Sequence, residues 1–298
     1  MNFPGSYALL RGELRRDEPM ALHTSWRVGG PAEFWYRPAD LKDLQIFLAG
    51  LAPDTPVHWV GLGSNLLVRD GGLSGAVISP QGVIDNISRL GDNIVYAESG
   101  VACAKLARTC SRWGLGPSEF FAGIPGTVGG ALAMNAGAFG GETWERVNAV
   151  DVIDRNGKLR RRHRDEYEVA YRSVIGPADE WFIGAEFHFD QGVPVGREAI
   201  QELLARRKAT QPIGVPSCGS VFRNPPDDHA ARLIEAAGLK GHRLGGAHVS
   251  EKHANFIINA GEATAADIEA LIDHVRETVL RKHGVDLTQE VRVLGVPA

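Results

Sequence analysis

The sequence lacks the short motifs by which many nucleotide-binding and hydrolytic enzymes are found. The glycines of Gly61-Leu62-Gly63 are followed by no third glycine at the spacing of the Rossmann fingerprint, and a helix is not expected directly after them. No GxxxxGK[ST] phosphate loop, GxSxG nucleophile elbow or CxxC pair occurs in the chain. Any nucleotide chemistry must therefore be carried by other patterns.

The sequence also has few cysteines, a small net charge and no long apolar run near its N-terminus. The three cysteines among 298 residues, Cys103, Cys110 and Cys218, are an odd number, which favours free thiols in a reducing cytoplasm. The first residues, MNFPGSYALLRGELRRDE, hold no apolar run of signal-peptide length, so we expect a cytoplasmic protein. A formal net charge of −4 gives no overall attraction to nucleic acid or to an anionic membrane.

Histidine is present, but not in the spacing of a metal site. His242, His248 and His253 do not form the i, i+4 helical pair of zinc enzymes, and Gly245-Gly246 separates the first two. We therefore expect no bound metal.

One stretch of 22 residues, Phe120 to Gly141, contains no charge and is long enough to span a bilayer. It also holds seven glycines and Pro125, and each glycine costs a helix about 1 kcal/mol relative to alanine. The density of glycine disfavours a membrane helix. It leaves two alternatives, a segment for close packing between domains and a loop whose backbone N–H groups approach an anion.

A second glycine loop favours the interpretation that these segments bind a ligand. The segment VHWVGLGSNLLV, residues 57–68, is typical of a strand followed by a turn at Gly61-Leu62-Gly63-Ser64-Asn65. Two glycine loops about 60 residues apart suit a ligand with two linked phosphates.

The remaining pattern predicts a mixed α/β protein of 298 residues, with one large domain or two of ordinary size. Strands are expected at 32–38, 75–79, 93–100 and 180–190, and helices at 39–50, 101–115, 197–209, 228–239 and 264–284. Cys103 and Cys110 share one face of the helix at 101–115, as core residues do.

Asn156-Gly157 predicts the turn of a hairpin whose second strand carries five basic residues. This strand could bind nucleic acid, but a solvated hairpin face fits the acidic chain better. Glycine and proline near 191–195 indicate a domain boundary. Further along the chain, PSCGSVFRNPP (216–226) is either an ordinary turn or a constrained loop that aims the Ser220 hydroxyl.

Seven ordered segments resemble the UDP-N-acetylenolpyruvoylglucosamine reductase family along nearly the whole chain. They are TSWRVGGPA (24–32), VGLGSNLLV (60–68), GIPGTVGGALAMNAGAFG (123–140), YRS (171–173), CGSVFRNP (218–225), HANFIIN (253–259) and EVRVLG (290–295).

The resemblance implies a mixed α+β and α/β fold with an FAD-binding region of the vanillyl-alcohol-oxidase type. That region would span 1–190 in two subdomains split near 85, and a substrate domain would span 191–298, with its last strand returning to the active site. Non-covalent FAD would contact Gly61, Leu62, Gly63, Ser64, Asn65 and Leu66, then Gly123, Ile124, Pro125, Gly126, Thr127, Val128 and Gly129, and finally Asn135, Ala136 and Gly137.

The family's reaction implies roles for three further side chains. NADPH, as co-substrate, reduces FAD, and the enolpyruvyl substrate then enters the same pocket. Arg172 would stabilise charge at the substrate's carboxylate, Ser220 would donate the proton, and Glu290 would orient the carboxylate or a proton relay. Tyr171 and Asn224 would contact the UDP-sugar, and no nucleic acid, membrane or obligate protein partner is implied.

Two departures from the family pattern lie beside Arg172. Ser173 follows Arg172 directly where the family has Tyr-Arg-x-Ser, and only eight residues separate Arg172 from Trp181. The chain therefore resembles the branch without an inserted loop. A sister flavoprotein oxidase and a non-catalytic nucleotide-binding module remain alternatives, since fold does not fix function.

Overall fold

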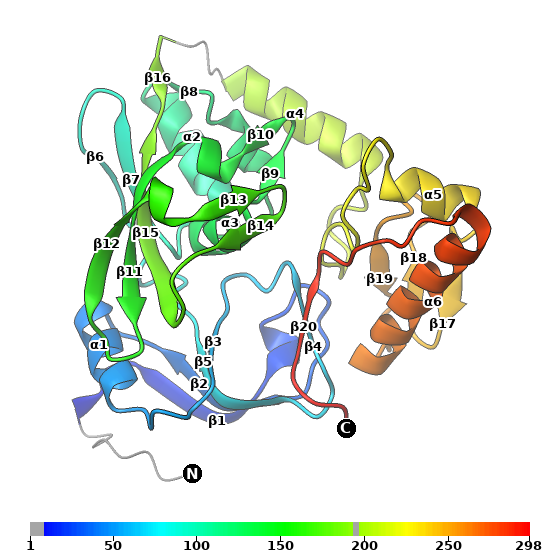
Figure 1. Cartoon of the computed structure of the whole chain (residues 1–298), viewed down its shortest axis with the longest axis horizontal. Helices are drawn as coiled ribbons and strands as arrows, with labels where there is room; N and C mark the ends of the chain where they lie inside the picture. Colours follow the sequence, from blue (N-terminus) through cyan, green and yellow to red (C-terminus); the bar gives the residue numbers. More distant parts are fainter. Residues whose placement is uncertain (1–8, 193–196) are drawn as a thin grey trace. The chain divides into compact units, whose positions relative to one another are not determined.

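The computed structural model describes residues 9–192 and 197–298, which form two compact units (Figure 1). Unit 1 consists of the N-terminal residues up to Arg15 together with Trp35–Gly61 and Gly75–Arg206. Unit 2 consists of Arg16–Phe34, Leu62–Ser74 and Arg207–Ala298.

A five-stranded antiparallel sheet of order β12-β11-β15-β7-β6 forms the centre of unit 1 (Figure 1). The helices α2 and α3 contribute to the same core, where Cys103 and Cys110 are fully buried, as predicted. The strands of this sheet are β6 (Ile87–Arg89), β7 (Ile94–Glu98), β11 (Val147–Asp154), β12 (Leu159–His163) and β15 (Glu180–His188). The helices are α2 (Cys103–Arg112) and α3 (Val128–Met134).

Short elements complete unit 1 around this sheet. They are η3 (Glu119–Gly123), η4 (Thr143–Glu145), η5 (Arg164–Glu166), α4 (Arg197–Thr210), and the strand pairs β8 (Leu115–Gly116) with β16 (Asp190–Gln191), β9 (Gly137–Ala138) with β10 (Gly141–Glu142), and β13 (Glu168–Ala170) with β14 (Ser173–Ile175). The last residues of α4 fall in unit 2.

A second sheet has the order β1-β2-β5-β3, and three of its strands begin in one unit and end in the other. Within unit 1 the helix α1 (Leu41–Ala49) packs Leu44, Phe47 and Leu48 into an apolar cluster with Tyr36. The strands are β1 (Glu13–Pro19), β2 (Pro31–Arg37), β3 (Val57–Trp59) and β5 (Leu73–Ile78), and η2 (Met20–Leu22) follows β1.

Unit 2 is built on a three-stranded antiparallel sheet, β17-β18-β19, against which α6 packs its apolar face. Its strands are β17 (Arg243–Leu244), β18 (Ala247–Val249) and β19 (Ile257–Asn259), and its helices are α5 (Ala230–Ala236) and α6 (Ala265–His283). The last strand, β20 (Arg292–Leu294), pairs in parallel with β4 (Leu66–Val68).

The strongest local signals in the sequence produce the expected elements. Thr264 caps α6 through a reciprocal hydrogen-bonded box with Asp267, and Gly284 ends the helix in the left-handed conformation at φ 69°. Gly157 likewise adopts φ 75° in the turn between β11 and β12. These residues confirm the helix expected at 264–284 and the hairpin.

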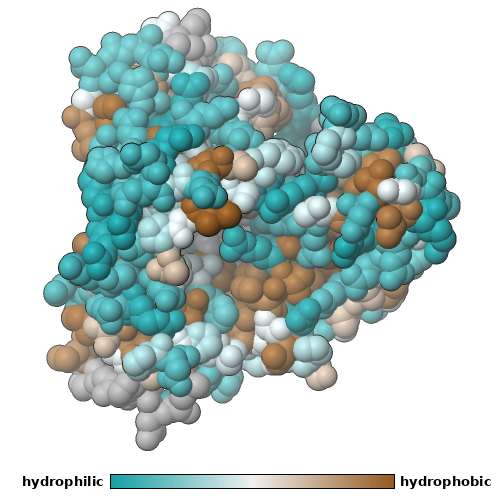
Figure 2. All heavy atoms as spheres, in the orientation of Figure 1, coloured by the Kyte–Doolittle hydropathy of each residue, from teal (hydrophilic) through white to brown (hydrophobic). Residues whose placement is uncertain are grey.

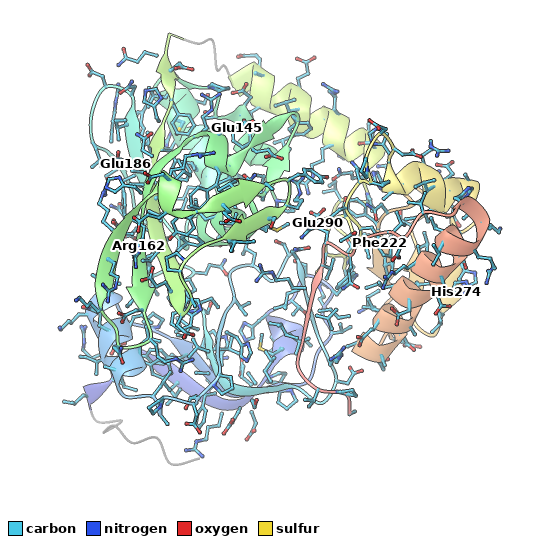
Figure 3. The ribbon with its side chains drawn as sticks, viewed as in Figure 1. Glu145, Arg162, Glu186, Phe222, His274 and Glu290 are labelled. Carbon is cyan, nitrogen blue, oxygen red and sulfur yellow. The ribbon has the colours of Figure 1, made fainter. Side chains whose placement is uncertain are left out.

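The basic strand β12 is a solvated hairpin face, as predicted. Arg160, Arg161 and Arg162 each lie within ion-pair distance of carboxylates on neighbouring strands and turns (Arg162 of β12 and Glu186 of β15 are labelled in Figure 3). Hydrophilic residues cover the same region of the surface (Figure 2). The positive charge is thus compensated within the protein, which argues against a nucleic-acid patch.

The uncharged stretch Phe120–Gly141 forms short turns and not one helix. It runs from η3 through the seven-residue α3 into the β9–β10 hairpin. Over the described residues, the structure has no helix long and apolar enough to cross a membrane. The predicted boundary at 191–195 lies partly outside the described residues, and the predicted division at 190 stays a prediction.

Asp43 links α1 to β2 and to the segments that precede β1 and α1, so its substitution tests the packing of this part of unit 1. The fully buried carboxylate accepts hydrogen bonds from the Tyr36 hydroxyl and from the backbone N–H groups of Arg11 and Ala39. Burial by itself raises the pKa of Asp43, but the hydrogen bonds outweigh burial, so its pKa lies below the usual value.

Asp43→Asn should therefore lower the free energy of unfolding by about 2–3 kcal/mol at pH 7. Because the folded-state pKa is depressed, this contribution is complete above the unfolded pKa of about 3.9 and is lost as the pH falls through the folded value. Urea unfolding of both proteins should give curves that approach each other below about pH 4. The exposed Asp54→Asn is the control, and an equal loss in both variants would contradict the assigned role.

Candidate active site

The first glycine loop, residues 61–66, presents consecutive backbone donors. Among the residues that the structure describes, no acceptor lies within hydrogen-bonding distance of the N–H groups of Gly61, Leu62, Gly63 and Ser64. Gly63 adopts φ 59°, and a β-carbon there would lie 2.1 Å from the carbonyl oxygen of His23. Only glycine fits this position, so the conformation of this row of amide donors depends on it.

In the second glycine loop, residues 123–129, some donors are already used. Val128 donates its N–H to Val101, Gly129 donates to Ser99, and Thr127 begins α3 by accepting from Gly130 through its hydroxyl. Within the described chain, the N–H groups of Gly126 and Thr127 have no acceptor. The donors available to a ligand are therefore confined to the tip of the loop.

Within unit 1, Gly61 at the start of the first loop contacts the second loop. A β-carbon on Gly61 would lie 2.5 Å from the hydroxyl oxygen of Thr127, so the backbone of one loop touches the side chain of the other. Beside this contact, Gly61, Gly126 and Thr127 have N–H groups for which the described residues offer no acceptor, and such donors can bind the phosphates of a dinucleotide such as FAD. Ser99 lies behind the second loop, its buried hydroxyl has no partner among the residues that the structure describes, and no signal in the sequence identifies it.

Arg172 occupies a strained turn in unit 1. It follows Tyr171 in a two-residue connection between β13 and β14, where Ala170 pairs with Ser173. The connection is tight, and Arg172 adopts φ 55°, a conformation that favours glycine. Strain of this kind, held by the surrounding structure, is common at functional sites.

The Arg172 guanidinium lies on the segment predicted to line the flavin. Its Nη1 donates to the carbonyl oxygen of Asn135 at 3.3 Å, and its Nη2 donates to the carbonyl oxygen of Gly137 at 3.0 Å. The ring of Tyr171 lies 4.8 Å from the guanidinium carbon. The structure thus brings Arg172 together with residues 135–137, and Tyr171 remains half exposed beside them.

In unit 2, Ser220 and Glu290 lie on paired segments. Val221, next to Ser220, accepts the N–H of Glu290 at 2.8 Å, and Phe222 bridges to Gln289 (Figure 3). The Ser220 side chain is half buried, and its hydroxyl has no partner among the residues described. The serine is therefore available to a ligand.

The first glycine loop contacts the same segments. The Asn65 amide donates to the carbonyl oxygen of Glu290 at 3.1 Å, and the Asn65 carbonyl oxygen accepts the N–H of Arg292 at 3.1 Å. The Cys218 thiol donates to the carbonyl oxygens of Gly63 and Leu66. Unit 2 thus gathers the predicted FAD loop, the predicted proton donor and Glu290.

Cys218 is a poor candidate for proton donor. It is buried, its thiol already donates to two carbonyl oxygens, and burial raises its pKa to about 12. These properties describe a structural cysteine.

Asn224 and Arg223 follow Ser220 on the same loop. The Asn224 side-chain oxygen accepts the N–H of Ala230 at the start of α5, which orients the amide. The Nε of Arg223 is buried and has no partner in the described part of the chain. Arg223 was not predicted from the sequence, although the arginine stands between two predicted site residues.

The three histidines do not converge. The described residues contain no group of three histidine, cysteine or acidic side chains able to hold a metal ion. Burial lowers the pKa values of His248 and His253, whose Nδ1 atoms have no hydrogen-bond partner over residues 9–192 and 197–298.

Comparison with known proteins identifies the family. Residues 33–162 match the FAD binding domain, and residues 211–294 match the C-terminal domain of UDP-N-acetylenolpyruvoylglucosamine reductase. UDP-N-acetylenolpyruvoylglucosamine reductase of Alkalilimnicola ehrlichii is 62% identical over 95% of this chain and 95% of its own length, and that of Methylococcus capsulatus is 58% identical over 96% and 94%. The chain belongs to this family.

A solved structure agrees with the assignment to the reductase family. UDP-N-acetylenolpyruvylglucosamine reductase from Thermus caldophilus superposes with a TM-score of 0.82 at 31% identity, covering 96% of this chain and all of that one. The chain is thus an FAD-dependent oxidoreductase of the UDP-N-acetylenolpyruvoylglucosamine reductase family, with the predicted mixed fold. The predictions of family, fold class and FAD are confirmed.

Gly63→Ala should weaken FAD binding, because the added carbon would collide with the His23 carbonyl and strain a left-handed backbone by about 1–3 kcal/mol. Flavin content after purification and the melting temperature should both fall. Gly91→Ala, where no atom lies within 4 Å of the added carbon, should leave both unchanged. Full flavin occupancy in Gly63→Ala would show that this loop does not hold the cofactor.

Proposed function

We propose that the protein reduces UDP-N-acetylglucosamine enolpyruvate to UDP-N-acetylmuramate, with NADPH as reductant, in the cytoplasmic synthesis of peptidoglycan precursors. Membership of the reductase family supports the overall reaction. The observation that carries the proposal is the half-buried Ser220 hydroxyl, which has no partner in the described chain and lies one residue from the segment paired with Glu290.

FAD would be held by the amide donors of both loops. Residues 61–64 and 126–127 offer N–H groups to the pyrophosphate, and residues 135–137 would line the flavin beside Arg172. When bound and reduced, FAD supplies the hydride for the terminal methylene of the enolpyruvyl group. The substrate-binding domain would follow the division near 190 that the sequence predicts, and Tyr171 and Arg172 would contact the substrate from the FAD-binding region.

Arg172 would stabilise the negative charge that develops at the substrate's carboxylate. A guanidinium stays charged at any physiological pH and offers a planar fork of donors to a carboxylate. Its two bonds to backbone carbonyl oxygens fix the plane of the guanidinium before the substrate arrives. Electrostatic stabilisation is most effective when donors are already oriented in this way.

Ser220 would donate the proton to the carbon next to the carboxylate. A serine hydroxyl is a weak acid, so its alkoxide must be stabilised or its proton replaced through a relay. Glu290 lies on the segment paired with the Ser220 loop and would orient the carboxylate or that relay. Tyr171 and Asn224 would contact the UDP-sugar.

NADPH would use the substrate's pocket. The sequence has no Rossmann fingerprint that would give NADPH its own site. In such an arrangement NADPH must leave before the enolpyruvyl substrate binds. Nothing in this scheme requires a nucleic acid, a membrane or an obligate protein partner.

The absorbance of the flavin tests the proposed function. Anaerobic NADPH should bleach the protein's visible absorbance, and UDP-N-acetylglucosamine enolpyruvate should then restore it with formation of UDP-N-acetylmuramate. Recovery only on admitting oxygen would indicate an oxidase, and a colourless protein would indicate a module without FAD.

Ser220→Ala should separate proton donation from reduction by NADPH. Bleaching by NADPH should be nearly unchanged, whereas reoxidation by the substrate should slow by about 10²–10⁴-fold, the usual contribution of general acid catalysis. Cys218→Ala is the neighbouring control and should reoxidise at close to the wild-type rate. Anaerobic stopped-flow absorbance measures both steps, and a slow Cys218 variant beside a normal Ser220 variant would reverse the assignment.

A further inference from the structure

Glu142 contacts the surroundings of Arg172 without belonging to the predicted FAD or substrate residues. It ends the β9–β10 hairpin, where it pairs with Gly137. Its Oε1 lies 3.9 Å from Nη1 of Arg172, beyond hydrogen-bonding distance, and its Oε2 accepts a hydrogen bond of 2.7 Å from the Asn135 amide. The short contact is therefore the one to Asn135.

Asn135 connects Glu142 to the turn that carries Arg172. The Asn135 amide nitrogen also donates to the carbonyl oxygen of Ala170, at the base of the β13–β14 turn, at 3.1 Å. Its side-chain oxygen accepts the N–H of Trp144, and its carbonyl oxygen accepts from Arg172. The bonds to Glu142, Ala170 and Trp144 depend on the orientation of the side-chain amide, whereas the bond from Arg172 depends on the backbone at Asn135.

Asn135 itself is buried and strained. Only 2% of its surface is exposed, and it ends α3 in the left-handed conformation at φ 47°. A buried amide in this conformation keeps one orientation only when its donors and acceptor are satisfied. Glu142 supplies the shortest of these bonds, at 2.7 Å.

We propose that Glu142 is a positioning residue for Arg172, acting through the Asn135 amide. Its carboxylate orients that amide, the amide fixes the base of the β13–β14 turn, and the Asn135 and Gly137 carbonyls then hold the guanidinium. The role rests on the proposed function of Arg172. Because Asn135 belongs to the segment predicted to line the flavin, flavin content is measured separately from the rate of reoxidation.

Glu142 also has a structural role that the test must separate. It forms a reciprocal capping box with Glu145 around the turn η4 (Glu145 is labelled in Figure 3). Loss of this box would lower stability and affect both half-reactions alike. Glutamine can replace glutamate in hydrogen bonds of this type, so Glu142→Gln keeps the box and the acceptor for Asn135.

The test compares Glu142→Ala, Glu142→Gln and the exposed control Glu168→Gln on the adjacent strand β13. Each holoprotein is measured for flavin content, melting temperature, anaerobic reduction by NADPH and reoxidation by the enolpyruvyl substrate. Reoxidation in Glu142→Ala should slow by about 10- to 100-fold, as expected for misplacement of a catalytic group by about 1 Å. Its flavin content and reduction by NADPH should stay near wild type.

The rate of flavin reoxidation in Glu142→Gln should lie within about threefold of the wild-type rate, because the glutamine oxygen can accept the hydrogen bond from Asn135. Glu168→Gln should match wild type in every measurement. Equal slowing of both half-reactions in Glu142→Ala, or a Glu142→Gln as slow as Glu142→Ala, would overturn the positioning role. If Glu142→Ala loses its flavin, Glu142→Asp replaces it with the same expectation, since the shorter carboxylate falls short of Asn135.

The wild-type protein separates this inference from the function on which it rests. Failure of the wild type to be reoxidised by the enolpyruvyl substrate would contradict the proposed function. Normal wild-type turnover with unaffected reoxidation in Glu142→Ala would contradict only the role of Glu142.

Discussion

The left-handed backbone of Gly63 is the constraint on which the candidate site in unit 2 depends. The carbonyl oxygen of Gly63 accepts the N–H of Ser25 and also lies within hydrogen-bonding distance of the Cys218 thiol, so the first glycine loop contacts two segments that are distant in the sequence. Two residues later, Asn65 bonds to Glu290 and Arg292 through its side chain and its backbone. The left-handed backbone at Gly63 makes these contacts possible, and only glycine tolerates the nearby His23 carbonyl.

In both glycine loops, hydrogen bonds to other segments hold the backbone, while several N–H groups have no acceptor in the part of the chain that the structure describes. Val128 and Gly129 anchor the second loop through their own N–H groups, and the donors of Gly126 and Thr127 remain at its tip. Backbone donors held in this way recognise an anion without the entropic cost of ordering a long side chain. Arg172 is held in a similar way, since backbone carbonyl oxygens orient its guanidinium.

Local chemistry made much of the fold predictable. Capping residues such as Thr264 and Gly284 and the Asn156-Gly157 turn specify their elements within a few residues, so the sequence alone located the helix α6 and the β11–β12 hairpin. The glycine loops were recognisable because glycine at that density has few structural uses.

Contacts between distant residues were not predictable from local pattern: Asn65 and Glu290 are 225 positions apart, and no nearby residue indicates that they bond. The orientation of Arg172 by Asn135 and Glu142 depends on a tight turn and a buried amide, which no periodicity reveals.

The central claim of this account is that the backbone N–H groups of the two glycine loops hold the FAD pyrophosphate. Amide hydrogen exchange, compared between the holoprotein and the same protein freed of flavin, tests it most directly. Donors without an intramolecular acceptor exchange readily and should become protected only when a ligand accepts their hydrogen bonds. The account predicts that FAD slows exchange most strongly in peptides covering residues 61–64 and 126–127. Unchanged exchange in both peptides, with protection by FAD elsewhere in the chain, would contradict it.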